Sequence, residues 1–237
     1  MTQRSSSPNQ SPLCISVHLP KTAGTSFADS LGQAFRDGLR LAYDERPLNR
    51  HPTIRKLRAL KLATAHARKG IGDDSTKCIH GHILPMAYSR FRDRSEPIFL
   101  TWLRHPLDRL QSHYNYWLDN YEEQTAGALH RRVIEEAWSF ERFALSRELK
   151  DIYQAFLWRF PARRFTFIGI TEHYAEDLAY LSEEVLRSPV PESRKNVGNS
   201  EARADLALSG SQRARIEKHH ARDFALYDWA LRQRQRR

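Results

Sequence analysis

The chain is poor in cysteine and has no long apolar segment. Cys14 and Cys78 are its only cysteines among 237 residues, which excludes a disulfide framework and leaves two thiols in expected strands. No apolar run approaches the ~20 residues that a transmembrane helix needs. Residues 1–12 are rich in Ser, Gln and Pro and lack the apolar core of a secretory signal. We therefore expect a disordered lead-in over 1–12 and a cytoplasmic protein.

Acidic residues are in the minority. There are 28 Asp and Glu against 38 Lys and Arg, for a formal net charge of +10. Such an excess suits nucleic acid, an anionic surface or an anionic small ligand. No zinc-finger or RNA-recognition pattern accompanies it, however, so we expect no nucleic-acid partner and mostly solvated basic faces. The basic residues are densest at Arg55, Lys56, Arg58, Lys61, Arg68 and Lys69, and in the tail at Arg232, Arg234, Arg236 and Arg237.

The chain also lacks internal repeats and an interior linker, so one domain over 13–237 is expected. Apolar runs predict strands at 13–17, 39–43, 77–82, 98–103 and 165–169. Helical spacing predicts helices at 27–35, 53–67, 107–120, 129–138, 149–158, 172–186 and 211–231. Alternating strands and helices indicate an α/β fold with a central parallel sheet covered on both faces. Loops after such strands meet at one edge, where ligands bind.

The first of these loops, between His18 and Phe27, has unusual chemistry. Pro20 ends the strand because it has no N–H for a sheet ladder, and Gly24 permits a tight turn before the helix. A helix N-terminus stabilises an anion, and Lys21 adds a positive charge. The loop is not a Walker A motif, G-x-x-x-x-G-K-S/T, since Lys21 precedes Gly24. An ordinary strand-to-helix turn capped by Thr25 or Ser26 is the alternative.

The order of residues 20–26 resembles the loop that holds the 5′-phosphosulfate in sulfotransferases using 3′-phosphoadenosine 5′-phosphosulfate (PAPS). The preceding His18 makes it most similar to carbohydrate sulfotransferases of the 2-O-sulfotransferase type, and the missing anchor would fit a bacterial member. The resemblance implies a P-loop-NTPase-like fold. It also implies that PAPS is bound by Lys21, Thr22, Ala23, Gly24, Thr25 and Ser26.

A second motif runs from Arg104 to Ser112. Arg104 follows the strand 98–103, and Ser112 lies on the next expected helix. An arginine fork pairs well with phosphate oxygens, and in the resembled family an arginine and a serine at this spacing bind the 3′-phosphate of PAPS. The alternative is an arginine that bonds nearby carbonyls and a solvent-facing serine. Arg109 could assist, or could lie on the surface.

The third motif is His80-Gly-His82. Residues two apart on a strand face the same side, so both rings could point into the cleft. In the resembled family one histidine of such a pair is the general base, a role that suits a pKa near working pH. We place His82 ahead of His80 because it is nearer the strand end. A structural histidine and a metal pair are the alternatives; no third ligand with clear spacing is present, so no metal is expected.

Weaker similarity extends over 165–172 and over 194–200, where Arg194 and Lys195 would close over the nucleotide. Residues 39–74 and 121–163 match no motif and are expected to shape the acceptor pocket. The resemblance implies a sulfotransferase that moves the sulfuryl group of PAPS to a hydroxyl, with a saccharide as expected acceptor. A P-loop-like kinase and a basic nucleic-acid-binding module remain alternatives. Acceptor identity and oligomeric state are left open.

Overall fold

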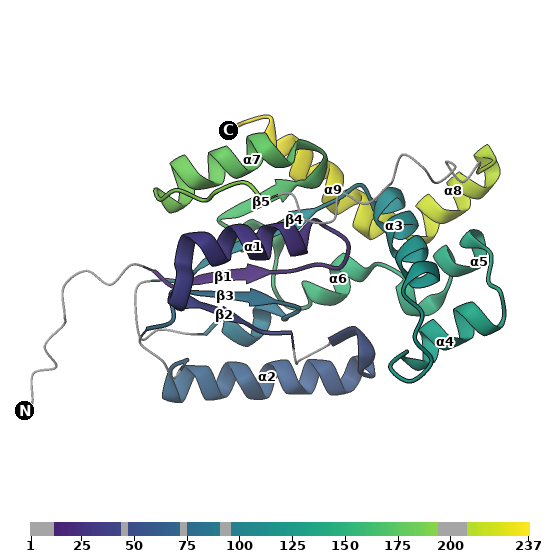
Figure 1. The fold of residues 1–237 in the computed structure, drawn as a ribbon, viewed down its shortest axis with the longest axis horizontal. Coiled ribbons are helices and arrows are strands. Elements are labelled where there is room, and N and C mark those ends of the chain that lie inside the picture. Colours follow the sequence, from purple (N-terminus) through teal and green to yellow (C-terminus); the bar gives the residue numbers. More distant parts are fainter. Residues whose placement is uncertain (1–11, 44–46, 72–74, 91–95, 194–207) are drawn as a thin grey trace, which may run out of the picture.

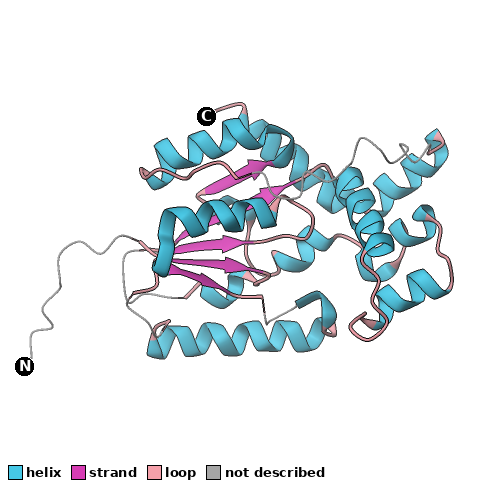
Figure 2. Cartoon of the chain, viewed as in Figure 1, coloured by secondary structure: helices cyan, strands magenta, loops and turns pink. Residues whose placement is uncertain are grey.

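The sheet has five parallel strands in the order β2-β3-β1-β4-β5. A computed structural model describes residues 12–43, 47–71, 75–90, 96–193 and 208–237. Helices lie on both sides of the sheet (Figure 2), so the expected α/β class is confirmed. The strands are β1 Cys14–Val17, β2 Leu39–Leu41, β3 Cys78–Gly81, β4 Ile98–Leu103 and β5 Phe167–Ile170. Most of the expected lead-in, Arg194 and Lys195 lie outside the described residues.

The helices differ from expectation mainly in the C-terminal half. They are α1 Gly24–Phe35, α2 Pro52–Lys69, α3 Pro106–Asp119, α4 Ala128–Glu135, α5 Phe140–Ala144, α6 Ile152–Phe156, α7 Tyr174–Tyr180, α8 Gly210–His219 and α9 Ala221–Arg234. The helix predicted over 211–231 is two helices that break at His220. The first of the two, α8, starts with a capping box formed by Ser209 and Gln212. Residues 85–88 form a buried 3-10 turn between β3 and β4.

The strands divide the core by their two-residue period. Cys14 on β1 packs with Leu31 of α1 and Leu178 of α7 in one apolar cluster. Its neighbours on β1, Ile15 and Val17, face the opposite cluster, because successive side chains of a strand point to opposite faces. Both faces are apolar, as expected for a parallel sheet.

The topology places a switch point beside β1. From β1 the chain passes through β2 and β3 on one side, and then crosses to β4 on the other side of β1. Ligands of open α/β sheets bind outside the carboxyl ends of strands at such a point. In Figure 1, α3, α4, α5 and α8 group beyond these carboxyl ends. The loops after β1, β3 and β4 therefore open toward a second layer of helices.

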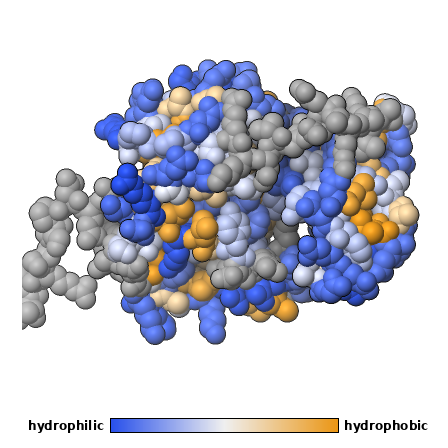
Figure 3. Space-filling model, in the orientation of Figure 1, coloured by the Kyte–Doolittle hydropathy of each residue, from blue (hydrophilic) through white to orange (hydrophobic). Residues whose placement is uncertain are grey.

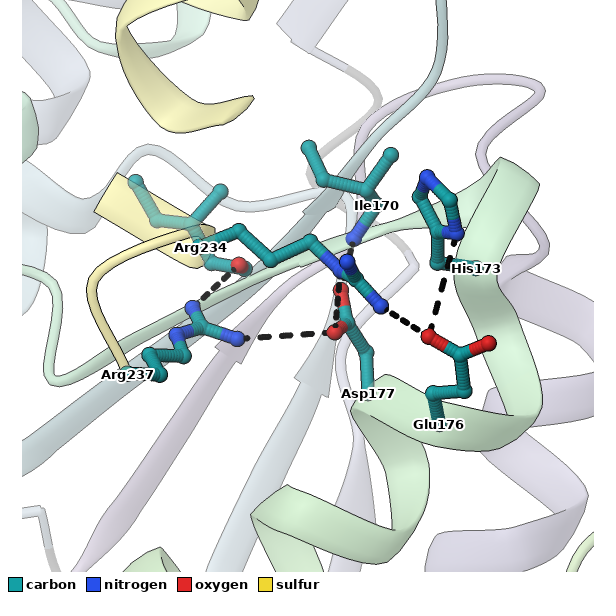
Figure 4. Close-up of polar contacts among 7 residues, drawn as sticks. Ile170, His173, Glu176, Asp177, Arg234 and Arg237 are labelled. Atoms are coloured by element: carbon teal, nitrogen blue, oxygen red, sulfur yellow. Dashed lines mark hydrogen bonds and ion pairs between the residues drawn. The ribbon is translucent and has the colours of Figure 1, made fainter. Parts of the chain in front are cut away.

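The basic C-terminal residues do not all lie in solvent. Arg234 donates from Nε to the buried Asp177 over 2.8 Å and also pairs with Glu176. Arg237 donates to the Ile168 carbonyl of β5 over 2.6 Å. Figure 4 shows these side chains converging on α7. The tail therefore fastens α9 to α7 and β5, which the sequence pattern did not indicate.

The outer surface follows the expected pattern more closely. Figure 3 shows hydrophilic residues over most of one face, with apolar residues in small separate groups. On α2 the basic side chains of Arg58, Lys61, Arg68 and Lys69 are exposed, so the expectation of a solvated basic face is confirmed there. Among the described helices, none is both long and apolar enough to cross a membrane.

Gly81 shows why the middle residue of the histidine motif is glycine. A Cβ at this position would lie 2.1 Å from the backbone oxygen of Ala42, which follows β2. We expect Gly81→Ala to lower the free energy of unfolding by roughly 1–3 kcal/mol or more, because backbone atoms must shift. Gly210→Ala is the control, since no heavy atom lies within 4 Å of its added Cβ. Urea unfolding of both variants measures this, and equal midpoints would contradict the close approach.

Candidate active site at the carboxyl edge of the sheet

The loop after β1 carries unusual backbone strain. Lys21 and Ala23 have φ values of 66° and 59°, in the left-handed region that residues with a Cβ avoid. Each such residue costs on the order of 1–3 kcal/mol, and strain of this kind gathers at functional sites. The Thr22 hydroxyl donates to the Leu19 carbonyl over 2.8 Å and braces the loop from within.

The loop leads into α1, and the N-terminus of this helix has no side-chain cap. Ala23 occupies the N-cap position and makes no capping bond. Capping by Thr25 or Ser26, the ordinary alternative for this turn, is therefore wrong. The helix itself provides no partner for the N–H groups of its first turn. These groups and the helix dipole favour an anion at the start of α1.

Gly24 is required because a histidine ring occupies the place of its missing side chain. A Cβ on residue 24 would lie 1.7 Å from His18 Nε2. The His18 ring is therefore held against the first residue of α1. The loop and the histidines behind it form one packed unit.

Three histidine rings lie one against another behind the loop. The His18 ring stacks on His82 with centroids 4.3 Å apart and on His80 with centroids 5.4 Å apart. Tyr43, just beyond β2, brings its hydroxyl within 3.0 Å of His18 Nδ1 and its ring edge against His82. The sequence motifs did not identify Tyr43; its place at the end of the predicted strand 39–43, at the same sheet edge, was the available signal.

His82 presents a basic nitrogen. Its Nδ1 lies 2.8 Å from the His18 carbonyl oxygen, which can only accept, so Nδ1 carries the proton of the neutral ring and Nε2 carries the lone pair. Burial lowers the pKa of His82, and the bond to the His18 carbonyl partly opposes this. The ring is therefore neutral at pH 7 while still partly exposed.

His80 differs sharply from His82. It is 1% exposed and hydrogen-bonds through Nδ1 to Ser16 Oγ over 2.8 Å. Phe27 of α1 covers its ring edge-on at 5.8 Å. Burial first, and then the charge of His82, lowers the pKa of His80 to about 3. The expectation that both rings face the cleft is therefore wrong for His80, which packs between the sheet and α1.

Two cations meet at this edge. Burial, and then the charge of Arg104, lowers the pKa of Lys21 to about 8. The Lys21 ammonium lies 3.8 Å from the centre of the Tyr116 ring on α3. The Tyr153 hydroxyl fixes the Arg104 backbone, accepting from its N–H over 3.1 Å and donating to its carbonyl over 2.7 Å. In the described part of the chain neither cation forms a close ion pair with a carboxylate; Arg104 only adds to the larger effect of His105 in lowering the pKa of Asp108.

The α3 residues have different positions. Ser112 is half-buried and lies one helical turn before Tyr116, so both share the face turned toward Lys21. Arg109 is fully buried, which contradicts a surface role. Its guanidinium lies 5.7 Å from the Tyr153 ring and makes no hydrogen bond among the described residues.

Among the described residues, one buried group brings its possible ligand atoms within 4.8 Å of one another, as a metal site requires: Asp151, His220 and Asp223. Both Asp223 carboxylate oxygens, however, accept backbone N–H groups at the start of α6, from Tyr153 and Gln154. His220 donates from Nε2 to the Ala144 carbonyl and accepts at Nδ1 from the Asp151 N–H. These contacts show a polar clamp between α6 and α9.

Burial of His80 predicts acid sensitivity. Its pKa is depressed in the folded state, so the unfolded chain binds a proton below about pH 6.5 while the folded chain stays neutral. The free energy of unfolding therefore falls as the pH drops from 7 to 5, with up to about 2 kcal/mol from His80 alone. Urea unfolding at pH 7, 6 and 5 should show a weaker pH dependence for His80→Gln. The exposed His51 provides the control, His51→Gln, and identical slopes in all three proteins would contradict the assignment.

Comparisons with known proteins add two remote likenesses. No family model and no curated protein sequence matches the chain. A sulfotransferase from Alicyclobacillus acidocaldarius has a TM-score of 0.46 and 14% identity, covering 92% of this chain and 94% of its own. Mouse sulfotransferase SULT7A1 complexed with PAP has a TM-score of 0.38 and 15% identity, and the match covers 87% of this chain and 62% of the mouse chain. With both TM-scores below 0.5, neither likeness by itself assigns a function.

Proposed function

We propose that this chain is a PAPS-dependent sulfotransferase that transfers a sulfuryl group to a hydroxyl, with a carbohydrate as acceptor. The observation that carries the proposal is the convergence of an uncapped helix N-terminus, Lys21 and Arg104 at the switch point beside β1. An anionic ligand with negative groups at two places would satisfy both cations. The sequence resemblance of residues 20–26 and of Arg104 to Ser112 names PAPS as that ligand.

The two motifs divide this ligand between them. The first-turn N–H groups of α1, with Lys21 and residues 22–26, would bind the 5′-phosphosulfate. Arg104 and Ser112 would bind the 3′-phosphate. Arg194 and Lys195, outside the described residues, are proposed to close over the nucleotide. A nucleotide without a 3′-phosphate would leave the second group of residues unused, which favours PAPS over ATP.

His82 is the proposed general base. Its Nε2 lone pair is available because Nδ1–H is bonded to the His18 carbonyl. Nε2 accepts the hydroxyl proton as the hydroxyl oxygen bonds to sulfur, and the bond from sulfur to the phosphate oxygen breaks. Lys21 and the first-turn N–H groups stabilise the negative charge left on that phosphate. His80, committed to Ser16 and buried, supports the stack of rings instead.

A kinase is the alternative enzyme, since the same helix N-terminus could hold a nucleotide. It predicts turnover with ATP and magnesium and none with PAPS. A nucleic-acid-binding module predicts binding that weakens steeply with salt and is indifferent to Lys21 and His82. The placement of these two side chains at one sheet edge favours a small-ligand enzyme. A cytoplasmic location remains part of the proposal.

Arg104→Ala should weaken the binding of 3′,5′-adenosine bisphosphate (PAP) far more than the binding of 5′-AMP. A charge-assisted contact to a phosphate contributes about 1.5–3 kcal/mol to binding. AMP has no 3′-phosphate and never makes this contact, so its affinity should not change. Isothermal titration calorimetry with both ligands measures the difference, and the exposed Arg159 provides a control, Arg159→Ala, that should leave both affinities unchanged. Equal weakening of PAP and AMP by Arg104→Ala would mean that Arg104 supports the fold or the 5′-end.

His82→Ala should lower turnover by about 10²–10⁴-fold, the usual contribution of a general base. PAP binding should persist, because the base contacts the acceptor. The acidic limb of the pH–rate profile, set below pH 6.5 by the lowered pKa of His82, should vanish. His80→Gln should cost stability and keep that limb. If the limb instead disappears in His80→Gln and survives in His82→Ala, the two roles are exchanged.

A further inference from the structure

The Lys21 ammonium lies over the face of an aromatic ring. Its Nζ is 3.8 Å from the centre of the Tyr116 ring, close for a cation–π contact, which extends to about 6 Å. Tyr116 remains 48% exposed and belongs to α3, one turn after Ser112. Nothing in the sequence motifs singles out Tyr116.

An aromatic partner differs from an acidic one because it leaves the positive charge of Lys21 available to an anionic ligand. A carboxylate beside Lys21 would neutralise its charge and compete directly with an anionic ligand. The ring quadrupole attracts the ammonium while leaving its full positive charge. Within the part of the chain that the structure describes, no ion pair involves Lys21. Tyr116 can therefore hold the ammonium in place without neutralising its positive charge.

Both ends of the Lys21 side chain are thereby fixed. Its backbone is held in the left-handed region with φ 66°, and its head group is held by Tyr116. A lysine otherwise has four flexible carbons between these ends and loses much rotamer freedom on binding. We propose that Tyr116 is a positioning residue that pre-orients Lys21 for the leaving phosphate, an inference that rests on the proposed sulfuryl transfer.

The proposal distinguishes three substitutions. Tyr116→Phe keeps the ring face and should retain kcat/KM for PAPS within about twofold. Tyr116→Leu keeps apolar bulk but has no ring, and should lower kcat/KM by about 3- to 30-fold, mostly in kcat. Tyr116→Glu should pair with Lys21 and lower both turnover and anion affinity further. Leu118, 46% exposed on the same helix, provides the matched control Leu118→Ala, which should match the wild type.

The contact itself is measured by NMR on protein with ¹³C-labelled lysine, with the Lys21 signal assigned through Lys21→Arg. A ring face this close should shift the Lys21 ε-CH₂ resonance upfield. The shift should persist in Tyr116→Phe and disappear in Tyr116→Leu. Affinity for inorganic pyrophosphate, measured on the same samples, should fall in Tyr116→Leu and hold in Tyr116→Phe.

The results separate this inference from the proposed function. An upfield shift lost in Tyr116→Leu, with the expected loss of kcat/KM and rescue by Tyr116→Phe, supports it. No upfield shift in the wild type, or unchanged kcat/KM and pyrophosphate affinity in Tyr116→Leu, overturns it. If the wild type shows no turnover with PAPS, the sulfotransferase proposal fails, and the NMR shift and pyrophosphate affinity still decide whether Tyr116 orients Lys21 toward an anion.

Discussion

The His18 ring, set against the bare backbone of Gly24, is the contact on which the candidate site depends. The ring fills the space of a side chain at residue 24 and stacks on His82, while the backbone carbonyl of His18 accepts the Nδ1–H of His82. One residue thus joins the loop proposed to bind the anion to the histidine proposed as base. A larger residue at position 24 would disturb both at once, so the loop and the base are built as one unit.

The electrostatics of the site follow from burial without neutralisation. Burial makes the Lys21 ammonium costly to charge, and repulsion from Arg104 adds to that cost. A stable fold tolerates this because Tyr116 faces one cation and the Tyr153 hydroxyl ties down the backbone of the other. The arrangement stores unfavourable electrostatic energy that an anionic ligand would relieve. The proposed function rests on the positive charge concentrated here, and not on the overall net charge of +10.

Sequence patterns predicted what depends on local chemistry and missed what depends on tertiary contacts. The strand Ile98–Leu103 matches its predicted bounds because a continuous apolar run between polar ends allows one reading. The break at His220 was missed because it depends on contacts with Ala144 and Asp151, distant in sequence. Strand position ranked His82 ahead of His80, which lies deeper in the sheet, but the full burial of His80 depends on packing against Phe27.

We propose above all that this edge of the sheet binds the adenosine bisphosphate moiety of PAPS. Calorimetric titration of the purified chain with PAP, beside ATP with magnesium, tests it most directly. We expect one-to-one binding of PAP and much weaker binding of ATP, because only PAP offers a 3′-phosphate to Arg104. Absence of detectable PAP binding, or ATP binding as tight as that of PAP, would contradict it.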